Sequence, residues 1–237
     1  WQNHELCYAT SDLPDRDFVF GGTIVSNGDV GYHGRSEKDR LNMTGTTHGS
    51  IECINGQWYV FYHRLTHKSD YSRQACAEPI TILPDGSIPQ VEITSCGLNG
   101  KPLHGTGTYP AVIACNITNG HMPHGSNKIY TDSFPNATHC GEDRFIGEIQ
   151  DGTMLGYKYF AFSGAKEIGV QYRGSCNGKF VVSDDMDGKN IVAEIPVAPA
   201  NAWTESRAPL HISDGTHPLY LFYRGDGEAA VKELYLA

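Results

Sequence analysis

The sequence lacks any apolar run near the ~20 residues that a membrane-spanning helix needs. It has no Cys-x-x-Cys pair, so a zinc site of the usual kind is not expected. Basic residues are also few, since 18 Lys and Arg against 27 Asp and Glu give a net charge of −9. Because phosphate binding needs a basic face, nucleic acid is not an expected partner. The lack of a long apolar run likewise gives no reason to expect a membrane-spanning helix.

A secretory signal segment and an initiating methionine are missing as well. The chain opens at Trp1, within a stretch that is typical of a strand. We therefore expect these 237 residues to be a portion of a longer or processed protein.

Residues that favour β structure are abundant. The chain has 13 Tyr and 27 Gly, its hydrophobic content is 39%, and no long helical periodicity is visible. A chain of this length can build one large domain or two modest ones. Composition therefore indicates a β protein with a substantial core.

Short strands joined by turns recur along the chain. Asn55-Gly56 separates two β-type runs, 50–54 and 57–63, and this dipeptide suits a type I′ hairpin turn. Similar hairpins are expected at 81–93, 180–195 and 219–236. Such spacing is typical of a sandwich, a barrel or a propeller.

A segment rich in Gly, Asn, His and Pro interrupts the strands near residues 117–127. We predict two domains, 1–118 and 128–237, with a linker over 119–127.

Cysteines and sequons indicate an oxidising, secretory history, so an extracellular location is expected. The predicted disulfides are Cys96 with Cys115 and Cys140 with Cys176, and Cys7 either pairs with an upstream part or is a buried thiol. The N-x-[ST] sequons predict glycosylation at Asn42, Asn116 and Asn136.

Two groups of motifs resemble known families. HGSIECINGQWYVFYHR followed by SRQACAEPI resembles the end of the catalytic propeller of glycoside hydrolase family 43. IGEIQDGTMLGYKYFAF and GKFVVSDDMDGKNIVAEIPV resemble a family 6 carbohydrate-binding module. The resemblance implies an all-β chain, in which the last blades of a five-bladed β-propeller precede a β-sandwich of the jelly-roll type.

The resemblance also implies a reaction. Inverting members use a base carboxylate and an acid carboxylate, roughly 6.5–9.5 Å apart, and a third carboxylate tunes the acid. By the match of motifs all three lie upstream of Trp1, so no catalytic acid is expected in this chain. Asp29 is interpreted as a turn residue and Glu78 as a group that stabilises a strand end.

Two residues match positions near the sugar in family 43. His48 resembles the histidine that points into the central channel and helps to hold a metal ion or water; the alternative is a core histidine bonded to backbone. Arg73 resembles the arginine that reaches the sugar in the cleaved subsite; the alternative is a salt-bridged surface residue. Only their position in loops supports roles for His63, Arg64 and His67.

The sandwich retains few of the sugar contacts of family 6. Trp203 matches one stacking aromatic, Glu148 stands where the second is expected, and Val231 or Lys232 replaces an asparagine. At ~1 kcal/mol or more for each lost contact, sugar binding there should be weak. A second cleft on the sandwich stays open as an alternative, and packing against the propeller is the favoured role.

Calcium is the only cofactor that the resemblance implies, and no organic cofactor is expected. Asp132 and Glu233 match acidic positions that hold a structural calcium in the sandwich, and oxygen ligands suit this ion. The alternatives are solvated acids, or an ion near His48 in the propeller.

The leading hypothesis is the C-terminal portion of a secreted, inverting exo-glycosidase for arabinofuranosyl, xylosyl or galactofuranosyl residues of polysaccharides or glycans. Its expected partner is the N-terminal half of the same propeller. One alternative is a non-catalytic extracellular glycoprotein with a structural or carbohydrate-binding role. The other is a free carbohydrate-binding protein, which would need Trp203 in an open cleft.

Overall fold

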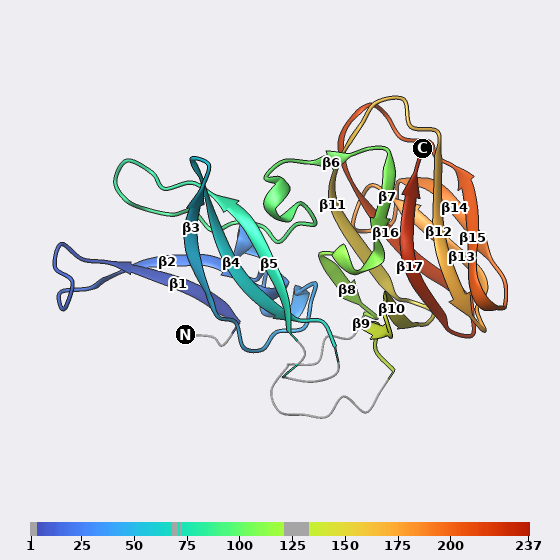
Figure 1. The fold of residues 1–237 in the computed structure, drawn as a ribbon, viewed down its shortest axis with the longest axis horizontal. Helices are drawn as coiled ribbons and strands as arrows, with labels where there is room; N and C mark the ends of the chain where they lie inside the picture. The colour runs from blue at the N-terminus through green and yellow to red at the C-terminus, as the bar shows by residue number, and fades with distance from the viewer. Residues whose placement is uncertain (1–3, 68–70, 72, 121–132) are drawn as a thin grey trace.

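The computed structural model describes residues 4–67, 71, 73–120 and 133–237. The described chain is built from β-strands and short 3-10 turns, which confirms the all-β prediction. Figure 1 shows an N-terminal group of strands beside a larger C-terminal sandwich. None of the described helices is long and apolar enough to cross a membrane.

The N-terminal group contains two small antiparallel sheets. The first is the β1–β2 hairpin and the second has the order β3-β4-β5. The turn between β3 and β4 has positive φ at both Asn55 (52°) and Gly56 (84°), which is the type I′ geometry expected from this dipeptide. The strands are β1 (Glu5–Thr10), β2 (Val19–Ser26), β3 (Gly49–Ile54), β4 (Gln57–Leu65) and β5 (Arg73–Ile80).

Single 3-10 turns link these strands and lead toward the sandwich. They are η1 (Asn27–Asp29), η2 (Tyr32–Gly34), η3 (Glu37–Asp39), η4 (Gly97–Asn99) and η5 (Ala111–Ile113).

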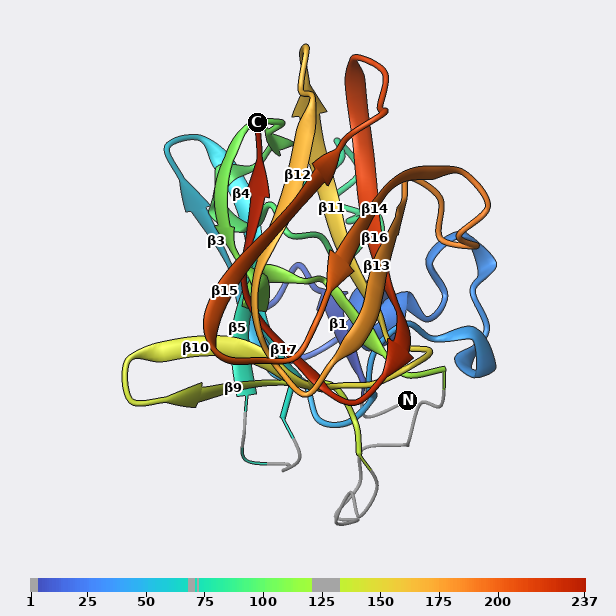
Figure 2. The ribbon, with the colours of Figure 1, turned by 90° about the vertical axis from the view of Figure 1, so that its right-hand side faces the viewer.

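The sandwich consists of two sheets whose inner faces share one hydrophobic core. One sheet has the order β15-β12-β17-β10-β9 and the other β14-β13-β16-β11-β6 (Figures 1 and 2). The first sheet is formed by β9 (Asn136–Cys140), β10 (Asp143–Ile149), β12 (Glu167–Gly174), β15 (Ala200–Pro209) and β17 (Ala229–Leu236). The second is formed by β6 (Leu103–His104), β11 (Met154–Phe162), β13 (Asn177–Ser183), β14 (Ile191–Val197) and β16 (Gly215–Asp226).

Residues 103–118 are hydrogen-bonded to the sandwich. The strand β7 (Gly107–Pro110) pairs with β17, while β6 and β8 (Asn116–Thr118) pair with β11. Ala111, Ala114 and Ile117 also enter the sandwich core. The division into domains at residue 118 stays a prediction, and the predicted linker lies outside the described residues from residue 121 onward.

Buried ionic contacts join the two groups of strands. Lys158 on β11 reaches across to Asp29 in η1, with 3.3 Å between Nζ and Oδ2, and to Glu92, with 2.7 Å between Nζ and Oε1. Near the other end of the junction, the Ala137 N–H donates to the carbonyl of Thr66 over 2.6 Å.

The predicted disulfides are not formed, since all seven cysteines are free. Cys96 and Cys115 contact different carbonyls of β11, those of Lys158 and Gly156. Cys140 is exposed at the end of β9, whereas Cys176 is buried in the sandwich core. The two predicted pairs are therefore wrong in this fold.

The sequon asparagines are buried rather than displayed. Asn42, Asn116 and Asn136 are 3%, 0% and 1% exposed. The amide of Asn42 donates to the Cys115 carbonyl, and that of Asn136 donates to the Phe134 carbonyl. A glycan has no room on these amides, so the prediction of glycosylation does not hold for the folded chain.

Candidate functional site

Two histidines and an arginine gather at one end of the three-stranded sheet. His48 precedes β3, His63 lies on β4, and Arg73 begins β5 opposite Leu65. The His48 N–H donates to Nδ1 of His63 over 3.3 Å, and the ring centroids are 5.3 Å apart. Hairpin pairing thus brings together the two residues, His48 and Arg73, that the sequence singled out.

His63, for which the sequence offered only the support of a loop position, lies on β4 in an environment that perturbs its pKa. Burial lowers its pKa, and the nearby Arg73 and His48 lower it further. A neutral imidazole follows near pH 7, which suits Nδ1 as the acceptor from His48.

The side chains of His48 and Arg73 are both exposed. Exposure excludes the alternative of a core histidine for His48. Its predicted place in a central channel stays a prediction, because that channel would need walls contributed by an upstream portion.

The remaining candidates of this region are buried and structural. Arg64 is 3% exposed and donates to the carbonyls of Ala114 and Cys115 and to the side chain of Gln74. It therefore ties the N-terminal sheet to the segment that leads into the sandwich.

Glu78 lies at the centre of a buried hydrogen-bond cluster. Its Oε1 accepts from the Thr94 N–H over 2.8 Å and from the Tyr62 hydroxyl over 3.2 Å, and Oε2 accepts from the Thr94 hydroxyl over 2.6 Å. Burial raises the pKa of Glu78 to about 7, although these hydrogen bonds oppose the rise. Asp29 lies in the 3-10 turn η1, as expected for a turn residue, but it is buried there as the partner of Lys158.

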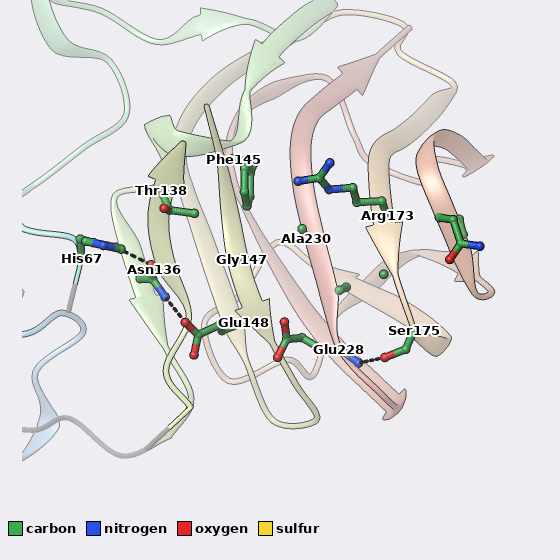
Figure 3. Close-up of a pocket in the computed structure, with 14 residues that line it drawn as sticks. His67, Asn136, Thr138, Phe145, Gly147, Glu148, Arg173, Ser175, Glu228 and Ala230 are labelled. Atoms are coloured by element: carbon green, nitrogen blue, oxygen red, sulfur yellow. Dashed lines mark hydrogen bonds between the residues drawn. The ribbon is translucent and has the colours of Figure 1, made fainter. Parts of the chain in front are cut away.

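The sandwich carries a pocket of about 530 Å³ over the sheet that contains β9, β10 and β12 (Figure 3). His67 reaches it from the N-terminal group, and its Nδ1 lies 2.6 Å from Oδ1 of Asn136. The polar side chains that line it include Asn136, Glu148, Arg173, Ser175 and Glu228.

Trp203 lies beside this pocket without forming an open platform. Its indole N–H donates to Oδ2 of Asp143 over 2.9 Å, and the guanidinium of Arg173 lies 4.4 Å from its ring centroid. The face that Arg173 covers is not available to a sugar. A sugar-binding role for Trp203 therefore stays a prediction, and one that these contacts do not favour.

Glu148 lines the pocket where family 6 would place an aromatic residue. Its Oε1 accepts from the amide of Asn136 over 3.2 Å, and its φ of 55° lies in the left-handed region. Sequence reasoning missed Arg173, because the residues that make it distinctive, Phe145 and Trp203, lie 28 and 30 positions away.

The calcium prediction rests on Asp132 and Glu233, of which the structure describes only Glu233. Asp132 lies outside the described residues, and Glu233 accepts from the Tyr235 hydroxyl over 2.8 Å. Within the described ranges no three His, Cys, Asp or Glu side chains are grouped to hold a metal ion. Calcium stays a prediction, both for the sandwich and near His48.

No family model matches the chain. A protein of Thermoclostridium stercorarium named xylosidase/arabinosidase is 44% identical over 247 residues, covering 98% of this chain and 51% of the relative. The chain thus spans about half the length of the curated relative that it matches.

Solved structures match as well. A family 43 arabinoxylan arabinofuranohydrolase from Bacillus subtilis, solved with cellotetraose, aligns over 99% of this chain and 47% of its own, with a TM-score of 0.52 and 19% identity. A family 6 carbohydrate-binding module from Clostridium cellulolyticum, solved with xylose, aligns over 56% of this chain and 98% of its own, with a TM-score of 0.47 and 15% identity.

The described fold is that of an all-β chain in which propeller-type strands precede a β-sandwich module. The likeness to the xylosidase/arabinosidase agrees with the resemblance to the C-terminal portion of a family 43 glycoside hydrolase, and the two-sheet sandwich agrees with the second module that the motifs implied.

Proposed function

We propose that this chain is the C-terminal portion of a secreted, inverting exo-glycosidase for arabinofuranosyl, xylosyl or galactofuranosyl residues. The observation that carries the proposal is the 44% identity to a xylosidase/arabinosidase over nearly the whole chain. The catalytic carboxylates belong to an upstream portion, where one activates water and the other protonates the leaving oxygen.

Within this scheme the chain contributes positioning groups. The exposed guanidinium of Arg73 can donate two parallel hydrogen bonds to sugar oxygens in the cleaved subsite. His48 and His63 stand beside it on the same end of the sheet, and the neutral imidazole of His63 holds the backbone of His48.

Exposed apolar side chains support an upstream partner. Phe18, Val19 and Phe20 are 60%, 67% and 56% exposed near the tip of the β1–β2 hairpin, and every residue of β3 is exposed. An exposed strand edge and exposed aromatic residues are a liability unless another sheet covers them. We propose that the N-terminal half of the propeller does so.

Replacement of Arg73 tests this role in the full-length protein. We expect Arg73→Ala to lower kcat/KM for nitrophenyl arabinofuranoside or xyloside by about 10- to 100-fold, the equivalent of lost charge-assisted hydrogen bonds. Release of nitrophenol measures the effect. The matched control is Arg144→Ala, at an exposed position on β10 of the sandwich, which should leave kcat/KM unchanged. Equal activity of Arg73→Ala and wild type would contradict the assigned role.

A non-catalytic extracellular scaffold is the second candidate. Glu148 in place of a stacking aromatic and the covered face of Trp203 favour it. The sequence upstream of Trp1 decides between the two, because a scaffold has no need of three intact carboxylates. Full-length protein that has all three and still releases no nitrophenol from the arabinofuranoside, xyloside or galactofuranoside would reject the glycosidase.

A further inference from the structure

We propose that the pocket of the sandwich binds an acidic saccharide, and that Arg173 holds the carboxylate of a uronic acid residue. This inference takes only one thing from the proposed function, namely that the ligand is a saccharide. It concerns the pocket over β10, β12 and β17, which is separate from the cluster of His48, His63 and Arg73.

The guanidinium of Arg173 stacks on aromatic rings, while the carboxylate of Asp143 interacts with it through charge and not through a hydrogen bond. The guanidinium lies 4.4 Å from the ring centroid of Trp203 and 5.1 Å from that of Phe145, and these two rings pack edge to face. Stacking of this kind fixes the plane of the guanidinium while leaving its N–H groups directed outward along that plane. Figure 3 shows Phe145 on β10 and Arg173 on β12, on the same face of one sheet, with β17 between the two strands.

Within the described ranges, no protein acceptor lies within hydrogen-bonding distance of the Arg173 guanidinium. Asp143 is the nearby acid, but its Oδ2 accepts from the Trp203 indole and its Oδ1 accepts from Nζ of Lys232 over 2.6 Å. Arg173 is half-buried, so its donors are partly withdrawn from water. A fork of unmatched N–H donors of this kind is complementary to a carboxylate, which accepts two parallel hydrogen bonds.

The opposite side of the pocket has a different chemistry. Glu148 and Glu228 line it together with Asn136 and Ser175 (Figure 3). Carboxylates and amides accept hydrogen bonds from sugar hydroxyls, but carboxylates repel a second anion. The pocket therefore fits a ligand with one carboxylate and several hydroxyls, which describes a uronic acid residue better than a phosphorylated sugar, whose phosphate carries up to two negative charges.

The test compares two ligands that differ at one group. The probes are a xylo-oligosaccharide with a single glucuronic acid branch and the same compound with its carboxyl reduced to the alcohol. Titration calorimetry with the wild-type chain should give at least about tenfold weaker binding for the reduced compound, as expected for loss of a charge-assisted pair. Added salt should weaken only the binding of the acid.

A matched pair of variants assigns the effect to Arg173. Arg173→Gln should bind both compounds with the weak affinity of the reduced one. Arg207→Gln is the control, because Arg207 also stacks on a ring, that of Tyr235 at 5.0 Å, but is paired with Glu167 and lies outside the pocket. It should keep the preference for the acid.

Equal affinity of the wild-type chain for the acid and the reduced compound would overturn the proposal, as would no binding of the acid. Preference retained by Arg173→Gln would also overturn it. The comparison of ligands on wild-type protein needs no variant to fold. Because hydrolysis is not measured, acid preference without nitrophenol release from the full-length protein would reject the glycosidase and keep this site.

Discussion

At the scale of single residues, burial decides which charged groups can contact a ligand and which stabilise the fold. Glu78 has the position and the raised pKa that often mark a catalytic acid. Its carboxylate, however, accepts hydrogen bonds from Thr94 and Tyr62, and the residue is 1% exposed. The carboxyl group of Glu78 therefore contributes to the stability of the β4–β5 pair rather than to a reaction.

The raised pKa of Glu78 predicts that the free energy of unfolding falls as the pH rises. Burial raises its folded-state pKa to about 7, above its ordinary value, so between roughly pH 4.5 and 7 the folded chain holds the extra proton. Stability from this group is present below that window and is lost as the pH rises through it, by up to about 3 kcal/mol. Urea unfolding between pH 5 and 8 measures the slope.

Glu78→Gln should flatten this pH dependence, because an amide keeps a neutral side chain in the same cluster. Glu142→Gln, on the exposed β9–β10 turn, is the matched control and should leave the slope unchanged. An unaltered slope in Glu78→Gln would show that another group causes it.

At the scale of elements, β11 links the sandwich to the N-terminal strands. Burial by itself would lower the pKa of Lys158, but the neighbouring Cys115, Asp29 and Glu92 raise it, so the amine stays charged. The side chains of Lys158 and Asp29 are each 1% exposed, which makes this a buried ion pair at a junction.

Removal of the cation should destabilise the junction strongly. Lys158→Met leaves the carboxyl of Asp29, whose pKa burial already raises, buried without its cation, at a cost of about 3–5 kcal/mol in the free energy of unfolding. Addition of Asp29→Asn should recover part of the loss. Denaturant unfolding is the measurement, with Lys179→Met as the control, because its exposed pair with Glu194 contributes at most about 1 kcal/mol. A small effect of Lys158→Met would mean that the carboxylates are solvated.

At the scale of the whole molecule, residues 103–118 belong to the sandwich by their hydrogen bonds. They add β7 beside β17 and β8 beside β11, and they contribute Ala111 and Ile117 to the core. A fragment of residues 101–237 should therefore unfold cooperatively on heating, whereas a fragment of residues 119–237 should not. Near-UV circular dichroism distinguishes the two, and an equal transition in both would contradict the structural role of this segment.

Much of the local structure could be read from the sequence. Asn55-Gly56 between two apolar runs specified a hairpin, because a two-residue turn and its strands are set by neighbouring residues. The same hairpin pairing, continued to β5, placed Arg73 near His63 and His48. The match of motifs marked His48 and Arg73 as candidates, because periodicity alone does not distinguish them from other polar residues.

Burial and long-range contact needed the tertiary structure. Asn42, Asn116 and Asn136 satisfy the local pattern of a sequon, yet packing encloses all three. The sequence by itself determined an all-β chain and the hairpins at 50–63 and 180–195, because those depend on local turn chemistry and alternation. The expected hairpins at 81–93 and 219–236 are wrong, since 81–93 holds no strand and β16 and β17 belong to different sheets. Only the tertiary structure decided which polar groups are buried and that Arg173 stacks on Trp203 and Phe145, because these depend on strands far apart in the chain being brought into one sheet.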